Sequence, residues 1–229
     1  MQVSEKKKNL VAENLREFGL LLFIIVLCIL VQLRNASFLT VQNIMDILTN
    51  TAILSILSLG MMMVLITRGI DLSIGATIAF SGMVTALTVS RYPGLSPFIA
   101  ILEGMALGGI FGAIIGMLVA KFSILPIIAS LGMMNIIRGL TYIVSGGKWV
   151  SSYQMSTGFK LIATGKTLGL NNLIVIAVVL HIIFYYFINH TRTGRRIYAV
   201  GSNPEAAEIS GIPKTEIIWL VYTLMGVIA

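Results

Sequence analysis

The chain is poor in charged residues and almost free of cysteine. Only 11% of its 229 residues are Asp, Glu, Lys or Arg, whereas about 25% is usual in a soluble domain. The hydrophobic fraction is 57% and the mean hydropathy is +0.95, so the composition excludes a soluble globular domain and predicts an integral membrane protein. The single cysteine, Cys28, lies inside an apolar run and has no partner for a disulfide within the chain.

The sequence also lacks the residue groups on which catalytic and metal sites are built. His181 and His190 stand apart from other metal-binding residues, and no Ser-His-Asp or paired-carboxylate set is evident. Residues 146–149, Gly-Gly-Lys-Trp, lack the earlier glycine and the following Ser or Thr of a phosphate-binding loop. The net charge of +7 comes from residues that flank apolar runs, and not from a basic, aromatic-rich stretch of the kind that binds nucleic acid. We therefore expect no enzyme activity, no cofactor, no metal and no nucleic-acid partner.

Long apolar runs predict an all-α polytopic membrane protein with six full transmembrane helices. These runs lie near residues 18–33, 44–67, 72–90, 98–120, 124–144 and 172–189. A seventh run begins at Ile217, and the 13 residues from there to Ala229 are fewer than the roughly 20 that cross a bilayer. We expect residues 1–229 to form one transmembrane domain with a truncated seventh helix. A short terminal helix at the membrane interface is the alternative.

The distribution of Lys and Arg predicts a cytoplasmic N-terminus. With that orientation, ten basic residues lie inside and six lie outside. The two densest clusters, Lys6–Lys8 and Arg192–Arg196, are both inside. The loop at 190–216 is then cytoplasmic, and the segment at 145–171 is the main outside loop, which either folds as a cap or touches a partner.

The longest polar stretch, residues 190–214, predicts a short helix over 204–210. Asn203 is a good N-cap, and Pro204 suits the first helical position because its missing N–H has no role there. Gly211 can take the left-handed conformation that ends a helix. Because a two-turn helix is marginal alone in water, we expect this one to dock against another structure.

In the fourth apolar run glycine recurs every four residues, at Gly104, Gly108, Gly112 and Gly116. This spacing places the four glycines on one helix face. Without side chains there, a second helix backbone can approach closely, which is a common way for helices to associate in lipid. The face is either a static helix contact or a sliding surface between helices that move during transport.

The third run carries hydroxyl groups at the same spacing, at Ser73, Thr77, Ser81 and Thr85. Such hydroxyls can bond to their own helix carbonyls, so a membrane tolerates them. They serve either as interhelical hydrogen bonds or as the wall of a pathway for an uncharged polar solute. The scarcity of charge along these runs argues against an ion channel.

A break separates the second and third runs, where residues 67–75 read Thr-Arg-Gly-Ile-Asp-Leu-Ser-Ile-Gly. A carboxylate at membrane depth is costly, which makes Asp71 a functional candidate. The segment is either a broken helix capped by Asp71 or Ser73, or a plain capped turn in the cytoplasm. We take as candidate pathway or broken-helix residues Gly69, Asp71, Ser73, Gly75, Thr77 and Ser81.

Three segments together resemble one known family. Residues 68–75 resemble the G-G-I-D-L-S-x-G signature of the sugar-type permeases of bacterial ABC importers, the ribose permease group. Residues 193–212 resemble that family's G-R-x-x-Y-A-x-G-x-N-x-x-A-A-x-x-S-G-I segment, and residues 130–139 match its T-L-G-x-x-x-x-x-R-G stretch. The resemblance covers nearly the whole chain but not the family's C-terminal spans. Arg68 replaces the usual first glycine, and Ser130 replaces a threonine.

The resemblance implies a permease subunit in the bacterial plasma membrane that moves a monosaccharide or a similar polyol-like solute. It further implies three protein partners: a second permease subunit, identical or related, a cytoplasmic ATPase and an extracytoplasmic solute-binding protein. The helix at 204–210 then resembles the coupling helix that docks on the ATPase. The residues implied in this coupling are Asn203, Pro204, Glu205, Ala206, Ala207, Glu208, Gly211, Arg195 and Arg196. The two arginines have an alternative role, which is to anchor the sixth span at the lipid headgroups.

Two other classes of function remain open. A secondary transporter driven by an ion gradient would be expected to carry paired intramembrane carboxylates or inverted broken helices, and only Asp71 comes near this pattern. A membrane scaffold that recruits a cytoplasmic protein would explain the loop at 190–216 but not the hydroxyl groups of the third run. ATP dependence of uptake separates the importer from the gradient-driven transporter, and any solute flux excludes the scaffold.

Overall fold

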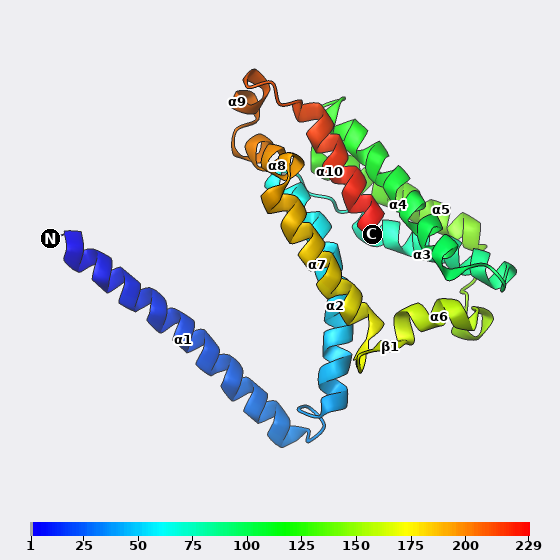
Figure 1. The fold of residues 1–229 in the computed structure, drawn as a ribbon, viewed down its shortest axis with the longest axis horizontal. Helices are drawn as coiled ribbons and strands as arrows, with labels where there is room; N and C mark the ends of the chain where they lie inside the picture. Colours follow the sequence, from blue (N-terminus) through cyan, green and yellow to red (C-terminus); the bar gives the residue numbers. More distant parts are fainter. Residues whose placement is uncertain (1) are drawn as a thin grey trace. The chain divides into compact units, whose positions relative to one another are not determined.

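A computed structural model describes the backbone of residues 2–229 and the side chains of residues 18–229 (Figure 1). The basic residues Lys6–Lys8 and Arg16, which the orientation argument uses, lie outside the described side chains. The chain divides into two compact units, residues 1–48 and Thr49–Ala229. Each unit is described by itself.

Helices dominate both units, which confirms the all-α class. The helices are α1 (Gln2–Arg34), α2 (Val41–Ile66), α3 (Ile74–Arg91), α4 (Pro97–Ala120), α5 (Pro126–Ser145), α6 (Thr157–Thr164), α7 (Asn172–His190), α8 (Arg192–Ser202), α9 (Pro204–Ile209) and α10 (Lys214–Ile228). A 3₁₀ turn, η1 (Ser152–Gln154), and two antiparallel two-residue strands, β1 (Lys166–Thr167) and β2 (Leu170–Asn171), complete the described chain. Proline stands at the start of α4 and α5, where its fixed φ suits the first helical turn.

Five helices are long and apolar enough to cross a membrane, judged by length and composition among the described residues. They are α2, α3, α4, α5 and α7. The apolar part of α1, Phe18–Arg34, is shorter. The polytopic membrane class is therefore established, and five of the six predicted spans coincide with such helices.

The unit Thr49–Ala229 is organised around α4 and α10, which lie side by side (Figure 1). A Cβ added at Gly108 would collide with the carbonyl oxygen of Gly226, and one added at Gly112 would collide with that of Tyr222. At Gly116 the added atom would lie 3.0 Å from the carbonyl oxygen of Trp219. Three of the four glycines of the fourth run thus face the backbone of α10.

The fourth glycine, Gly104, has a different neighbour. A Cβ added there would lie 3.5 Å from the hydroxyl oxygen of Thr85 on α3. The α4–α10 contact is further tied by the indole of Trp219, which donates to the carbonyl of Ala113 at 3.0 Å. Phe80 of α3 and Phe111 of α4 pack edge to face at 5.0 Å. The bundle is therefore held by close backbone approach and by aromatic packing. Such packing contacts are usual in lipid, where the hydrophobic effect does not drive helices together.

Two helices were missed in the sequence reading. Residues 192–202, read as loop, form α8, because Gly194, Ile197 and Val200 recur every three residues and are buried. The hydroxyl of Thr191 caps the helix by accepting from the N–H of Gly194 at 3.0 Å. Within the segment at 145–171, α6 is likewise a helix and is capped by Ser156.

Candidate functional site

The start of α9 is built as the sequence predicted. The side-chain oxygen of Asn203 accepts from the backbone N–H of Glu205 at 3.1 Å and from that of Ala206 at 3.0 Å. Pro204 occupies the first helical position, and Glu205 lies in the first turn, where the helix dipole favours a negative charge. The predicted N-cap is therefore confirmed.

The end of α9 is also closed by its own backbone. Gly211 has φ of +78°, in the left-handed region that glycine adopts without strain. Its N–H donates to the carbonyl of Glu208 at 3.0 Å, and the N–H of Ile212 donates to that of Ala207 at 3.0 Å. The helix ends at Ile209, one residue before the predicted end.

One face of α9 is anchored and the other is open. Ala207 is buried in the core of the unit, whereas Glu205 and Glu208 are exposed and Ile209 is 88% exposed. Neither carboxylate forms an ion pair within the part of the chain whose side chains are described. A rigid, capped helix that shows two acidic groups and a large apolar side chain is a surface suited to a protein partner.

We expect Asn203→Ala to weaken the start of α9. The substitution removes the acceptor of two hydrogen bonds, and loss of such a cap costs about 1 kcal/mol. Amide hydrogen exchange should accelerate roughly fivefold at Glu205 and Ala206 and stay unchanged in α10. Asn203→Asp is the control, since it keeps the acceptor; equal exchange in the Ala and Asp variants would contradict the cap's role.

The α8 helix carries a basic face. Arg192 lies one turn before Arg195 and Arg196 on it, and the three arginines, with Ala199 and Ile212, line a hollow of about 430 Å³. Arg195 reaches back to the carbonyl of His190 at 3.5 Å, a long and weak contact. The guanidinium groups of this face are thus available to anionic groups, either of a protein or of lipid.

The break between α2 and α3 is capped by Asp71. Its Oδ1 accepts from the backbone N–H of Ser73 at 2.8 Å and from the Ser73 hydroxyl at 2.6 Å. Asp71 is only 3% exposed and lies in the connection, outside the two spans. Burial raises the pKa of this carboxyl group, and the two bonds from Ser73 oppose that rise. Gly69 is buried against the ring of Tyr222, whereas Gly75 has open space around it.

Arg68 was not among the residues that the sequence singled out for function. Its side chain crosses from the break to the end of α8, where Nε donates to the carbonyl of Gly201 at 2.7 Å and Nη2 donates to that of Ser202 at 2.5 Å. The sequence marked this position only because Arg68 replaces the first glycine of the G-G-I-D-L-S-x-G signature. Nothing in that replacement indicated a contact more than 130 positions away.

The hydroxyl stripe of α3 is buried along its length. Thr77 donates to the carbonyl of Ser73 at 3.2 Å, and Ser81 donates to that of Ile78 at 3.2 Å. The buried hydroxyl of Thr85 has no hydrogen-bond partner among the described residues. Ser81 and Thr85 line a cavity of about 340 Å³ between α3, α4, α6 and α10.

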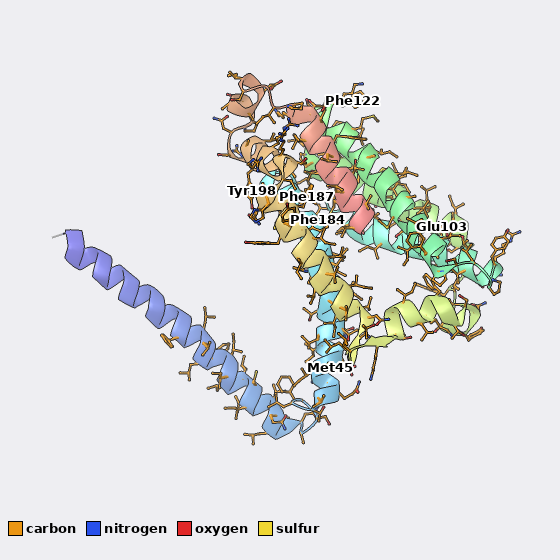
Figure 2. All side chains as sticks on the ribbon, viewed as in Figure 1. Met45, Glu103, Phe122, Phe184, Phe187 and Tyr198 are labelled. Carbon is orange, nitrogen blue, oxygen red and sulfur yellow. The ribbon has the colours of Figure 1, made fainter. Side chains whose placement is uncertain are left out.

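Glu103 is a carboxylate inside α4 that the sequence reading did not use (Figure 2). The hydroxyl of Thr88 donates to its Oε1 at 2.8 Å. Its Oε2 is buried without a partner among the described residues. Its position inside the fourth apolar run could have marked Glu103 as a functional candidate from the sequence.

No group of three or more His, Cys, Asp or Glu side chains suited to a metal occurs in the described part of the chain.

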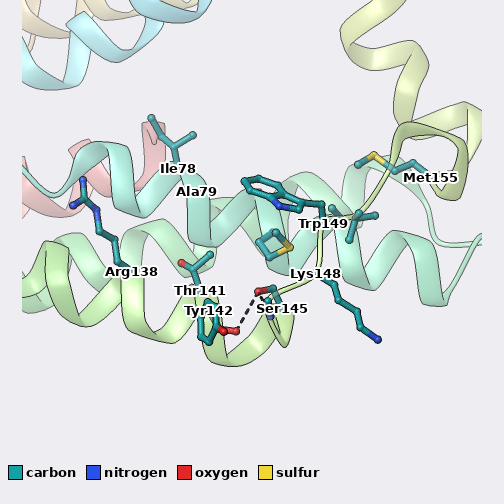
Figure 3. A pocket seen from close by; sticks show the side chains of 14 residues that line it. Ile78, Ala79, Arg138, Thr141, Tyr142, Ser145, Lys148, Trp149 and Met155 are labelled. Atoms are coloured by element: carbon teal, nitrogen blue, oxygen red, sulfur yellow. Dashed lines mark hydrogen bonds between the residues drawn. The ribbon is translucent and has the colours of Figure 1, made fainter.

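A second cavity, of about 590 Å³, lies between α3, α5 and the segment that follows α5. Figure 3 shows Arg138 and Tyr142 of α5, with Trp149 and Met155 of the following segment, around it. The hydroxyl of Ser145 donates to the carbonyl of Tyr142 at 3.1 Å and steadies the end of α5. The indole of Trp149 is 87% exposed, so this rim presents a large aromatic surface.

Comparison with known proteins decides the family. Residues 43–229 match the model of a family described as "branched-chain amino acid transport system / permease component". The chain belongs to this family. Its members are transport components, which agrees with the membrane class of the fold. No solved structure matches the chain.

Several curated proteins are similar to this member of the family. The ribose import permease protein of Bacillus subtilis (strain 168) is 35% identical over 216 residues, which cover 94% of this chain and 66% of that protein. The ribose import permease protein of Escherichia coli (strain K12) is 34% identical, with 91% of this chain and 65% of that protein covered. The D-allose transport system permease protein of the same strain is 33% identical, with 100% and 69% covered. The chain thus spans about two thirds of the length of these relatives.

Proposed function

We propose that the chain is the membrane-spanning permease subunit of an ATP-binding-cassette importer for a monosaccharide or a similar small polyol-like solute. The observation that carries this proposal is the similarity over nearly the whole chain to the ribose and D-allose permeases. The capped, outward-facing helix α9 supports it, since an importer of this kind needs a rigid contact with its ATPase.

A sugar fits the interior better than an amino acid, although the family's description names amino acids. An amino acid carries an ammonium and a carboxylate group, and a site that removes it from water must pair both charges. The cavity beside Ser81 and Thr85 is lined by no charged side chain among the described residues. Its hydroxyl groups suit the uncharged hydroxyl groups of a sugar, and its volume of about 340 Å³ lies in the range of about 300–1,000 Å³ of small-molecule sites.

On the cytoplasmic side, the proposed partner is the ATPase. Its contact surface includes Glu205, Glu208 and Ile209 of α9, which are exposed, and the exposed Arg195 and Arg196 of α8, the helix that packs against α9. The charges of both signs would fix the register of docking, because complementary charge contributes more to specificity than to affinity. With α9 inside, the N-terminus is cytoplasmic.

On the opposite side, the proposed partner is a solute-binding protein. The segment from Gly146 to Asn171 exposes Trp149, Tyr153 and Leu168. Exposed aromatic side chains on an otherwise polar segment are typical anchors of protein interfaces. We assign this segment as the permease's contact with the solute-binding protein.

A second permease subunit, identical or related, completes the proposed pathway. Helix α7 buries only Ala177 and Ile188 within the described part of the unit, so most of its surface is left to lipid or to that subunit. In the proposed topology α1 is the first span and α10 begins the seventh, with six full spans before it.

The gradient-driven alternative is less well supported. It requires carboxylates that act as a pair, and among the described side chains the buried candidates are Asp71 and Glu103. Asp71 caps the start of α3, while Glu103 bonds Thr88 near its end. About 20 Å of helix separates these positions, at 1.5 Å per residue. The two groups therefore do not form a coupled pair.

Uptake measurements test the proposal. The full-length permease, with its ATPase and solute-binding protein, should be reconstituted in liposomes and given labelled ribose and other pentoses and hexoses. We expect uptake of at least one sugar with ATP inside, and none with an ion gradient alone. Uptake driven by the gradient without ATP would establish the secondary transporter instead, and no flux of any sugar under either condition would favour the scaffold.

A further inference from the structure

The end of α8 is fixed against the break between α2 and α3 in two ways. The backbone of Gly201 lies directly against the carbonyl of Ile66, so closely that an added Cβ would collide with it. The guanidinium group of Arg68 also donates to the carbonyls of Gly201 and Ser202 at 2.7 and 2.5 Å. These carbonyls belong to the last turn of α8, where they have no acceptor role inside the helix. Arg68 satisfies them and places a positive charge at the negative end of the helix dipole.

The position of Arg68 is costly for an arginine. Its φ is +61°, in the left-handed region where a side chain is strained and where glycine is not. A residue held there persists only if the surrounding structure compensates for the strain. The two bonds to α8 are the compensation that the structure shows, and they exist only because a long, planar donor stands at this position.

The residues after Arg68 are held from the other side by α10. The hydroxyl of Tyr222 donates to the carbonyl of Ile70 at 3.4 Å, and its ring covers Gly69. The carboxyl group of Asp71 then caps α3 through Ser73. The four residues from Arg68 to Asp71 therefore touch α8, α10 and the start of α3.

This connection lies next to α9, so a movement of α9 can pass through it to α3. Ser202, whose carbonyl Arg68 holds, directly precedes Asn203, the cap of α9. A displacement of α9 reaches Ser202 through one peptide unit. From Ser202 it passes through the guanidinium group to the backbone of Arg68, three residues before the Asp71 cap of α3.

We propose that Arg68 is a positioning residue that transmits the movement of α9 to the start of α3. It acts as a strap between the end of α8 and the capped break, and its loss leaves only the backbone contact of Gly201 with Ile66 to join them. The inference rests on the proposed function, because it assumes that α9 receives the movement of an ATPase. It adds a residue outside the cytoplasmic loop to the coupling apparatus.

The test compares Arg68→Gly and Arg68→Lys in the full-length permease, reconstituted with its ATPase and solute-binding protein. The quantity measured is sugar taken up per ATP hydrolysed. Glycine relieves the left-handed backbone and removes both donors, so we expect this ratio to fall at least fivefold while ATP hydrolysis stays within twofold of wild type and thermal stability is not lowered. Lysine keeps the charge and reaches one carbonyl at most, so we expect an intermediate ratio.

Ser123→Gly is the matched control, because Ser123 also has positive φ, at +55°, in the connection between α4 and α5. It reports the effect of relieving such strain alone, and we expect no change in the ratio. An unchanged ratio in Arg68→Gly would overturn the strap, as would an equal fall of hydrolysis and uptake with lowered thermal stability, since that result belongs to a general role in folding. Failure of the wild-type protein to couple uptake to ATP would instead overturn the proposed function, so the two failures are distinguishable.

Discussion

Glu205→Lys combined with Glu208→Lys should leave the permease folded and inserted but separate it from its ATPase. Both side chains are exposed on α9 and make no ion pair within the described side chains, so their reversal removes no internal contact of the permease. Where each carboxylate faces a basic group of the partner, the reversal replaces attraction by repulsion. We expect at least a tenfold loss of ATPase retained in affinity purification from detergent, which corresponds to about 1.4 kcal/mol, and loss of ATP-driven uptake.

Glu216→Lys is the matched control for that double variant. Glu216 is exposed and lies in the first turn of α10, as Glu205 lies in the first turn of α9. The control therefore repeats one of the two charge reversals, with the loss of a favourable dipole interaction, on a different helix. We expect it to retain the ATPase. Normal retention by the double variant would show that α9 is not the docking helix, and loss in both variants would point to net charge and not to α9.

Gly112→Leu should disrupt the contact between α4 and α10. Even a Cβ at this position would collide with the carbonyl of Tyr222, and that atom is backbone of a helix that cannot move alone. Overpacking of a close contact costs about 1–3 kcal/mol or more. For a chain of this size each 1 kcal/mol lowers the melting temperature by about 2–4 °C. We expect the apparent melting temperature in detergent to fall by about 5 °C or more, with a lower yield of inserted protein.

Gly132→Leu provides the comparison. Gly132 lies within α5 with nothing within 4 Å of an added Cβ, so the substitution makes the same chemical change without a collision. We expect a melting temperature within about 2 °C of wild type. If Gly112→Leu behaves like Gly132→Leu, the two helices separate easily and the contact is a sliding surface. A large difference between the two variants identifies a static contact.

The short-range features of the chain were predictable because they depend on neighbours in sequence. The cap of α9 needs only Asn203 and the two N–H groups that follow it, and its end needs only a glycine in the left-handed conformation. The spans follow from runs of apolar residues, which identify helices by length alone. The α8 helix was missed because its polar face, with three arginines, resembles a loop when its buried positions are not recognised as a repeat.

The long-range features were decided by the tertiary structure. A row of glycines in α4 indicates close packing, but not that three of them meet α10 while Gly104 meets Thr85. A carboxylate inside α4 indicates a costly burial of charge in the membrane, but not that the hydroxyl of Thr88 on α3 donates to it. The choice of partner depends on how helices distant in sequence are brought together, and local periodicity carries no information on that choice.

The sequence by itself thus determined the membrane class, the positions of five spans, the capped helix after Asn203 and, through its motifs, the family. Those properties follow from hydropathy and from hydrogen bonds between residues a few positions apart. Only the tertiary structure decided that Arg68 holds the end of α8 and that Tyr222 covers the break before α3. The reason is physical: a guanidinium group bonds whichever free carbonyls the fold brings within about 3 Å, and Gly201 and Ser202 reach that distance only after α2 and α8 have packed together.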